Sequence, residues 1–252
     1  MTLEELQAIV DSVGTQAGWD FSAVRSERDP VPWHYLDVAR SYLRPDSRVL
    51  DLGTGGGERF LALADGFGQG VGVDIDPEMI KTAEASAPPD LQGKVSFSVM
   101  DATRLDFADG SFDVVLNRHC SVFAGEIMRV LKPGGVFITQ QVGDRNTYNI
   151  CNVFGVGVAG EHPPQRIGGP SGLEGLFKNT GCRTLALGEY DVPYFFSDVE
   201  SLIFWLKALP MPHDFAPARH LAQVNEILDR FMTPRGIETN DHRLLLIVRK
   251  PA

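Results

Sequence analysis

Cysteine is scarce in this chain, with three residues in 252, and no long apolar run is present. The cysteines (Cys120, Cys151 and Cys182) are odd in number and widely spaced, and none forms a C-x-x-C pair. This pattern indicates neither a disulfide framework nor a thiolate zinc site. The longest apolar-looking stretch, residues 151–160, is too short and too rich in glycine to cross a bilayer. We therefore expect no membrane-spanning segment.

Basic residues are also few relative to acidic ones. Lys and Arg together number 23 against 33 Asp and Glu, which gives a formal net charge of −10. Because phosphate contacts require clustered basic side chains, this balance disfavours nucleic acid as a partner. Residues 1–5 are acidic and contain no secretory apolar region, so the sequence predicts a cytoplasmic protein. The 43% hydrophobic content is sufficient for one well-buried domain with an elaboration.

The most informative segment is residues 49–58, in which an apolar run with Asp51 opens into a glycine cluster. A second short apolar run follows and ends at Asp74. A strand that turns sharply into a helix, with a ligand against the turn, requires backbone that carries no Cβ. The segment therefore predicts strand, glycine loop, helix and strand, which is the opening half of a nucleotide-binding α/β sheet.

The acids around this loop indicate what kind of nucleotide it binds. Asp74 follows Gly53 by 21 positions, close to the offset of about 20 residues typical of a ribose-binding acid. A dinucleotide fingerprint would need glycine at position 58, but Glu58 is there and disfavours a pyrophosphate. Asp51 would likewise repel a phosphate but attract an ammonium group. The loop thus favours a nucleoside with a cationic or zwitterionic tail, and an NAD(P)-dependent oxidoreductase is the alternative.

Residues 46–143 resemble class I S-adenosylmethionine-dependent methyltransferases through four motifs in order. The motifs are residues 49–58, residues 72–80, residues 95–102 with 107–115, and residues 126–135 leading into 136–139. The resemblance implies a Rossmann-like α/β fold with a mostly parallel seven-stranded sheet, helices on both faces and an antiparallel last strand. It also implies S-adenosylmethionine as cofactor, S-adenosylhomocysteine as product, and methyl transfer as the reaction.

The resemblance assigns cofactor-binding roles to residues in each motif. These residues are Asp51, Gly53, Thr54, Gly55, Gly57, Asp74, Ile75, Met79, Asp101 and Ala102, and Asn117 is added by its position just past the third motif. In the family, an acid at the position of Asp101 accepts a hydrogen bond from the adenine amino group; an ordinary turn aspartate is the alternative. Met79 is expected against the adenine ring, or else packed in the interior. Asn117 is expected near the amino-acid end of the cofactor.

His119 is the candidate catalytic base. It follows the fourth predicted strand, at the edge where strand ends face the ligand crevice, and histidine has a suitable pKa. The alternatives are a histidine that packs or binds the backbone, and a reaction in which positioning of an amine, thiolate or ring carbon suffices. No metal is predicted, because the spacing of Asp144, Glu161 and His162 does not favour one.

The remaining pattern predicts a single domain over residues 1–252. Residues 1–45 would form a helical N-terminal lid, residues 46–143 the cofactor-binding core, and residues 192–236 a helical cap inserted between the last two strands. Aromatic residues are dense from 190 to 215 and suit a small-molecule pocket, although core packing explains them equally well. A small molecule is the expected acceptor. A protein that binds the cofactor without transferring methyl is a further alternative, and the sequence does not indicate an oligomeric state.

Overall fold

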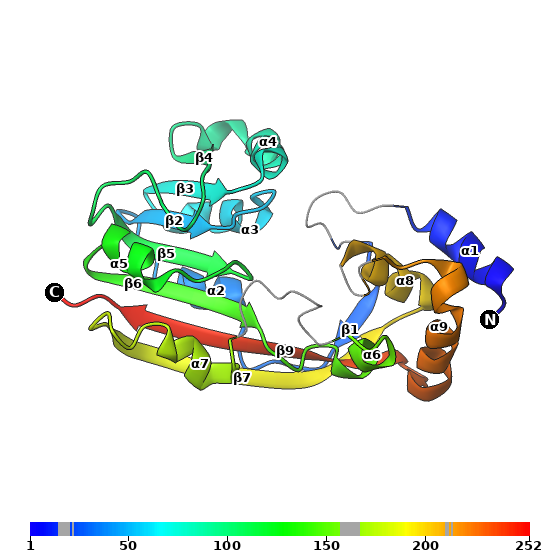
Figure 1. Ribbon diagram of the computed structural model, residues 1–252. Coiled ribbons are helices and arrows are strands. Elements are labelled where there is room, and N and C mark those ends of the chain that lie inside the picture. Colours follow the sequence, from blue (N-terminus) through cyan, green and yellow to red (C-terminus); the bar gives the residue numbers. More distant parts are fainter. Residues whose placement is uncertain (15–20, 22, 157–166, 210–211, 213) are drawn as a thin grey trace. The chain divides into compact units, whose positions relative to one another are not determined.

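The computed structural model describes residues 1–14, 21, 23–156, 167–209, 212 and 214–252. The chain divides into two compact units, each built from three segments (Figure 1). Unit 1 comprises Met1–Val31, Gly143–Arg166 and Tyr190–His242. Unit 2 comprises Pro32–Val142, Ile167–Glu189 and Arg243–Ala252. The expectation of one domain with a lid at 1–45 and a cap at 192–236 stays a prediction.

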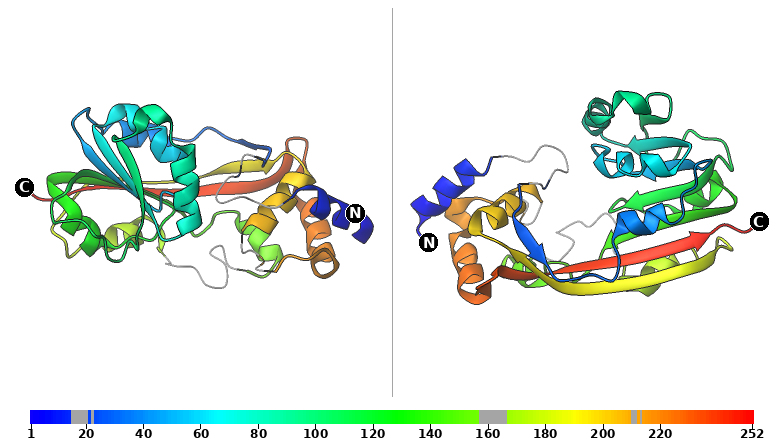
Figure 2. Two further views of the ribbon diagram at one scale, coloured as in Figure 1. Left: turned by 90° about the horizontal axis from the view of Figure 1, so that it is seen from above. Right: turned by 180° about the vertical axis from the view of Figure 1, so that it is seen from behind.

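Five parallel strands form the centre of unit 2, and the view from behind in Figure 2 shows the sheet that they build. They lie in the order β6-β5-β2-β3-β4. Their bounds are β2 (Arg48–Leu52), β3 (Gln69–Asp74), β4 (Val95–Val99), β5 (Phe112–Arg118) and β6 (Leu131–Val142). Leu52 is in register with Val73 and with Asn117, and Asp74 with Val99. The carboxyl ends of these strands therefore meet at one edge of the sheet.

The sheet continues beyond β6 with antiparallel pairing, as expected from the family. β9 (Gly236–Arg249) pairs antiparallel with β6, and β7 (Arg183–Phe196) follows β9 in the strand order. The sheet has nine strands within the described residues, not the seven expected. The additional strands are β1 (Ser26–Arg28), antiparallel to β7, and β8 (Met232–Thr233), antiparallel to β9. Both are too short to give an alternating pattern in the sequence.

Helices of unit 2 cover both faces of the parallel sheet. They are α2 (Tyr35–Arg40), α3 (Glu58–Leu61), α4 (Pro77–Ser86), α5 (Ala124–Val130) and α7 (Gly169–Gly175), with short 3-10 turns at Ala64–Gly66 and Pro89–Leu91. Val49 packs in one hydrophobic cluster with Tyr35 of α2, and Leu50 packs in another with Ile127 of α5. Neighbouring residues of a strand point to opposite faces, which explains the two clusters. The expected helices on both faces are confirmed.

Unit 1 is mainly helical, with α1 (Leu3–Ser12), α6 (Tyr148–Val153), α8 (Val199–Ala208) and α9 (Pro217–Phe231). Its core contains Leu6, Leu202, Ile203 and Ile227, all fully buried. The capping box of Thr2 and Glu5 is present at α1, as the sequence predicts. No described helix is long and apolar enough to cross a membrane, and residues 157–160 of the apolar stretch lie outside the described part.

Several predicted boundaries were wrong for reasons of packing. The sequence predicts a helix over residues 31–43, whereas α2 has six residues and ends at Arg40. The sequence also predicts a strand over residues 182–190, but this strand continues to Phe196 because the last residues of β7 pair with β1. The pattern of Ser197 and Glu200 predicts a capping box, whereas helix α8 is capped by the carboxylate of Asp198, which accepts the Ser201 amide at 2.8 Å.

Candidate functional site

The glycine loop at the end of β2 adopts backbone angles that favour glycine. Gly53, Gly55 and Gly57 have φ values of 68°, 55° and 80°. The amides of Gly53 and Thr54 both donate to the carbonyl of Val73, at 2.9 and 3.0 Å. The loop is therefore fastened to the end of β3, and its left-handed residues carry no Cβ that would strain the turn.

Neighbouring side chains approach the loop so closely that a Cβ would collide with them. A Cβ added at Gly53 would lie 2.5 Å from the Cβ of Cys120. One added at Gly72, on β3, would lie 2.7 Å from Phe97 and 2.8 Å from the Thr54 hydroxyl. Glycine thus permits a close packing of β2, β3 and the segment after β5, and this packing fixes the shape of the loop.

Asp74 joins the glycine loop to the segment that follows β3. Its Oδ2 accepts the Gly55 amide at 2.9 Å, and its Oδ1 accepts the Asp76 amide at 3.1 Å. An ionised carboxylate offers about four acceptor positions, so these two bonds leave capacity for ribose hydroxyls. The acid that the sequence predicts for ribose binding therefore also shapes the loop.

The Asp51 carboxylate lies at the end of β2, in an environment that raises its pKa to about 7. Desolvation by the surrounding protein is the main cause, and the charge of Asp74 adds to it. The nearby Thr54 hydroxyl and the charge of Arg118 oppose this increase. Within the described residues, the buried Thr54 hydroxyl makes no well-formed hydrogen bond. These two side chains are matched to a ligand that brings a positive charge and polar groups.

Apolar side chains are exposed at the same edge of the sheet. Ile75 is 68% exposed directly after β3, and Val99 is 52% exposed at the end of β4. Met79, on α4, is half-buried. The register places Asp74 beside Val99, so a flat apolar group has a surface next to the carboxylate of Asp74. The sequence pattern predicted no role for Val99. Its position as the last residue of a parallel strand is the feature that could have indicated one.

Asp101 and Ala102 begin a tight turn after β4. The Asp101 Oδ1 accepts the Thr103 amide at 2.8 Å, and this bond is the main cause of the lowered pKa of Asp101. The Asp101 carbonyl accepts the Arg104 amide at 3.0 Å. Asp101 thus has the hydrogen bonds of a turn aspartate, which was the alternative to adenine binding. Its side chain is also exposed and ionised beside the apolar surface. Its expected contact with adenine stays a prediction.

Asn117 is fully buried in a network of side-chain amides and hydroxyls. Its Oδ1 accepts from Thr139 at 2.9 Å and from Gln141 at 2.6 Å, and its Nδ2 donates to the Ser121 carbonyl at 3.2 Å. Gln141 also donates to the Cys120 carbonyl at 3.0 Å. The Asn117 amide thus joins β5, β6 and the segment after β5 inside the protein. Its expected place near the amino-acid end of the cofactor stays a prediction. No local sequence pattern indicates that Thr139 and Gln141 of β6 are the partners of Asn117.

His119 has a left-handed backbone, with φ of 60°, and its amide donates to the Gln140 carbonyl at 3.0 Å. Within the described part of the chain, Thr147 is the other non-glycine residue of positive φ. Such strain persists where surrounding structure imposes it, often at functional sites. The pKa of His119 is lowered well below its usual value by desolvation and by nearby Arg118, Arg243 and Arg59. The imidazole is therefore neutral near pH 7, on a residue whose surface is exposed.

Cys120 follows His119 and faces the glycine loop. Desolvation and the charges of Asp74 and Asp51 raise its pKa to about 11. The thiol therefore stays protonated near neutral pH, which lowers its reactivity as a nucleophile.

The aromatic residues expected around a substrate pocket are in the interior of unit 1. Phe196 is fully buried in its core, and Tyr194, Trp205 and Phe215 pack against that core. The packing explanation therefore accounts for these side chains, and a role in substrate binding stays a prediction.

Hollows elsewhere on the surface do not involve the predicted cofactor residues. A recess of about 520 Å³ in unit 1 is lined by residues including Arg145, Tyr148 and Asn240. A recess of about 430 Å³ in unit 2 is lined by residues including Arg104 and Phe107. The described residues contain no cluster of three or more potential metal ligands. Glu161 and His162, weighed as metal ligands, lie outside the described part.

Comparison with known proteins agrees with this geometry. Residues 50–139 match a family model described as a methyltransferase domain. The chain is 39% identical over 122 residues to 2-methyl-6-phytyl-1,4-hydroquinone methyltransferase of Synechocystis sp., covering 45% of this chain and 36% of that protein. It is 36% identical over 123 residues to norajmaline N-methyltransferase of Rauvolfia serpentina, covering 44% and 42%. The match thus spans less than half the length of these relatives.

A solved structure shares the fold over most of the chain. The crystal structure of a putative methyltransferase from Bacillus halodurans superimposes with a TM-score of 0.65, covering 86% of this chain and 97% of that one. Because the two sequences are only 18% identical, this similarity shows a common fold and nothing about function. The matched domain at residues 50–139 and this sheet topology agree with the four motifs, so this part of the chain is similar to a methyltransferase domain.

Proposed function

We propose that this protein transfers a methyl group from S-adenosylmethionine to a small-molecule acceptor by in-line displacement. The observation that carries the proposal is one edge of the parallel sheet in unit 2. There the glycine loop, the Asp74 carboxylate and the exposed Ile75 and Val99 lie at neighbouring strand ends. Polar groups beside an apolar surface suit a nucleoside.

The residues present fit S-adenosylmethionine better than a dinucleotide. Asp74 would hold the ribose, Asp101 the adenine amino group, and Ile75 with Met79 the adenine ring. Asp51 and the Thr54 hydroxyl would face the charged amino-acid tail, and Gly53, Gly55, Gly57 and Ala102 would supply backbone surface. When bound, the cofactor supplies a sulfonium-activated methyl group. The Glu58 carboxylate lies against Gly56 in the loop, where it opposes a pyrophosphate and argues against the oxidoreductase alternative.

The residues of this chain would mainly position and deprotonate the acceptor. A neutral imidazole at His119 is able to accept a proton from an acceptor hydroxyl or ammonium group as the methyl group is transferred. The desolvation and the arginine charges that keep His119 neutral also make it a weak base. We therefore infer that His119 would act only on an acceptor whose proton becomes more acidic as the methyl group is transferred. An acceptor that is already a free amine or an electron-rich carbon needs only positioning.

The acceptor class rests on charge and on the relatives. A net charge of −10 disfavours a nucleic-acid acceptor. The names of the two relatives specify a hydroquinone and norajmaline, the latter methylated at nitrogen, as their substrates. We infer a small organic acceptor for this chain as well.

Calorimetric titration with S-adenosylmethionine, S-adenosylhomocysteine and NADH in parallel tests the cofactor. We expect the first two to bind, NADH not to bind, and Asp74→Ala to lose the binding. Asp65→Ala is the matched control, because Asp65 is an exposed acid of unit 2 paired with Arg40. NADH binding alone would contradict the proposal and favour a redox enzyme.

Transfer of labelled methyl to a panel of hydroquinones and amines tests the reaction. Label in at least one product, absent with Asp74→Ala, is the expected result. Tight cofactor binding with no label in any acceptor would favour the alternative of a protein that binds S-adenosylmethionine without methyl transfer.

A further inference from the structure

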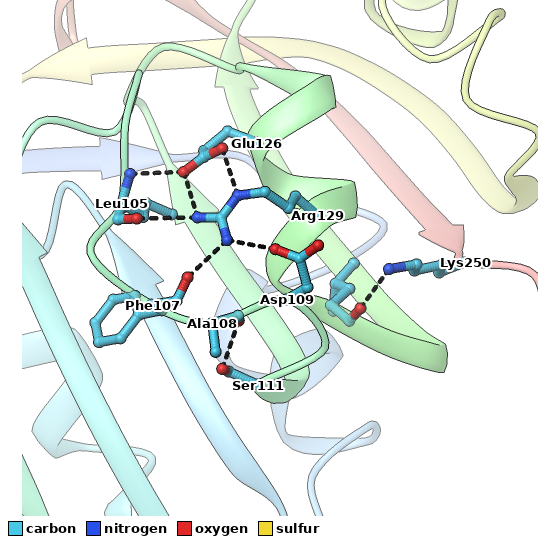
Figure 3. A network of polar contacts seen from close by, with 9 residues as sticks. Leu105, Phe107, Ala108, Asp109, Ser111, Glu126, Arg129 and Lys250 are labelled. Atoms are coloured by element: carbon cyan, nitrogen blue, oxygen red, sulfur yellow. Dashed lines mark hydrogen bonds and ion pairs between the residues drawn. The ribbon is translucent and has the colours of Figure 1, made fainter.

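Two residues of helix α5, Arg129 and Glu126, bind the segment between Asp101 and β5 (Figure 3). Arg129, on α5, donates through Nη2 to the Leu105 carbonyl at 2.9 Å and through Nη1 to the Phe107 carbonyl at 2.6 Å. Nη1 also donates to the Asp109 carboxylate at 2.8 Å. One guanidinium thus contacts three residues of a segment that lies 20 or more positions earlier in the chain.

Glu126 completes this arrangement from the preceding turn of α5. Both of its oxygens accept from Arg129, with Nε to Oε2 at 2.9 Å and Nη2 to Oε1 at 2.7 Å. Its Oε1 also accepts the Leu105 amide at 2.6 Å. The Leu105 peptide is therefore held on both sides, since its N–H binds Glu126 and its carbonyl binds Arg129. We call Glu126, Arg129 and their contacts with residues 105–109 the α5 clasp.

The clasp engages every donor of the guanidinium. Arginine carries five N–H groups in a fixed planar fork, and five contacts are made: two to Glu126, two to backbone carbonyls and one to Asp109. Lysine has three donors at one point and no fork. The arrangement therefore requires arginine at position 129.

The clasp is directly continuous with the turn that carries Asp101. This turn starts where the Met100 amide binds the Asp74 carbonyl at 2.9 Å, and it is closed by the Arg104 amide on the Asp101 carbonyl. Leu105 follows at once and is 4% exposed. The turn is thus fixed at one end by β3 and at the other by the α5 clasp. Only residues 102–104 lie between Asp101, which carries the carboxylate, and Leu105, whose peptide the clasp holds.

We propose that Arg129, through Glu126 and the Leu105 peptide, is a positioning residue that sets the Asp101 carboxylate for recognition of the adenine amino group. This inference rests on the proposed function, because it assumes that a ligand containing adenosine binds at this edge of the sheet. Arg129 itself touches no ligand. Its effect reaches the ligand through the turn at 101–104.

Binding of S-adenosylhomocysteine to Arg129→Met tests the proposal. We expect the Kd to rise about tenfold or more, since a misplaced acceptor loses a charge-assisted hydrogen bond. Arg40→Met is the matched control, because Arg40 also joins an acid, Asp65, and a backbone carbonyl, that of Ala62, in unit 2. The control is expected to bind within about twofold of the wild type.

A ligand comparison separates positioning from general loss of structure. S-inosylhomocysteine carries a carbonyl where adenine has its amino group. The wild type should prefer the adenosine ligand, and Arg129→Met and Asp101→Ala should both lose the preference. Their combination should be no worse than Asp101→Ala alone, because residues that act in series are not additive.

Glu126→Gln provides a milder variant if Arg129→Met does not fold. It keeps an acceptor for the Leu105 amide but weakens the ion pair, and we expect an intermediate loss of the same ligand preference. Arg129→Lys should resemble Arg129→Met and not the wild type. A clasp variant that keeps the full adenosine preference would overturn the positioning role. If the wild type itself binds neither S-adenosylhomocysteine nor S-adenosylmethionine, the proposed function fails and this inference fails with it.

Discussion

The carboxylate of Asp74 accepts the backbone amide of Gly55 at 2.9 Å, so that the end of β3 holds the glycine loop of β2. The same carboxylate accepts the Asp76 amide and thereby orders the start of α4. One side chain thus connects the loop, the strand and the helix that together line the candidate cofactor site. Loss of Asp74 is therefore expected to disturb loop geometry as well as ribose contacts.

Gly53→Ala should destabilise the fold more than a typical change to alanine. Its Cβ would lie 2.5 Å from the Cβ of Cys120, in a backbone region that alanine disfavours. Overpacking and backbone strain together should lower the free energy of unfolding by about 2–4 kcal/mol. Urea denaturation measures this change.

Gly93→Ala is the control for that experiment. Gly93 has φ of 79°, but no atom lies within 4 Å of its added Cβ. It should therefore show the strain alone, at about 1 kcal/mol. Equal losses in the two variants would contradict a specific close contact between the glycine loop and Cys120.

Titration of Asp51 should make the free energy of unfolding fall as the pH rises. Its pKa is about 7 in the folded chain, and an unfolded aspartate has a pKa of about 3.9, so the folded state binds the extra proton between these values. The free energy of unfolding should decrease from about pH 4 to pH 7 and then level off. The slope in this window should be smaller in Asp51→Asn, as measured by urea denaturation at several pH values.

Cofactor affinity should change in the opposite direction with pH. An ionised Asp51 attracts the ammonium group of the amino-acid tail, so binding of S-adenosylhomocysteine should strengthen as the pH rises through about 7. In Asp51→Asn, affinity should be weak and flat across this range. A wild-type affinity that is also flat would remove Asp51 from the cofactor site.

Replacement of His119 should separate strain from catalysis. His119→Gly relieves the left-handed backbone, so we expect stability to stay equal or to rise by about 1 kcal/mol. If His119 is the base, turnover should fall by about 10²- to 10⁴-fold while the Kd for S-adenosylhomocysteine stays the same. His119→Ala keeps the strain and should show the same kinetic loss without the gain in stability. Unchanged turnover in both variants would remove the role of His119 as base.

Features that depend on local pattern follow from the amino-acid sequence alone. Apolar runs predicted β2 to β6, and the glycines after Leu52 predicted a loop that only a Cβ-free backbone allows. Asp76 before Pro77 predicted the start of α4, where Asp76 accepts the Glu78 amide at 2.9 Å. These signals lie within a few residues of each other, so no knowledge of distant contacts was needed.

Features that depend on residues far apart in the chain follow from the packing of strands and helices. Gln141, on β6, donates to the Asn117 amide oxygen of β5, and neither residue indicates this pairing by its local sequence. Pairing with β1 extends β7 to Phe196, and the amide of His119 is held to Gln140 of the neighbouring strand in a strained conformation. Arg129 likewise reaches back across 20 or more residues to the segment behind Asp101. Such contacts form only when the strands and helices pack together, which is why local sequence patterns did not indicate them.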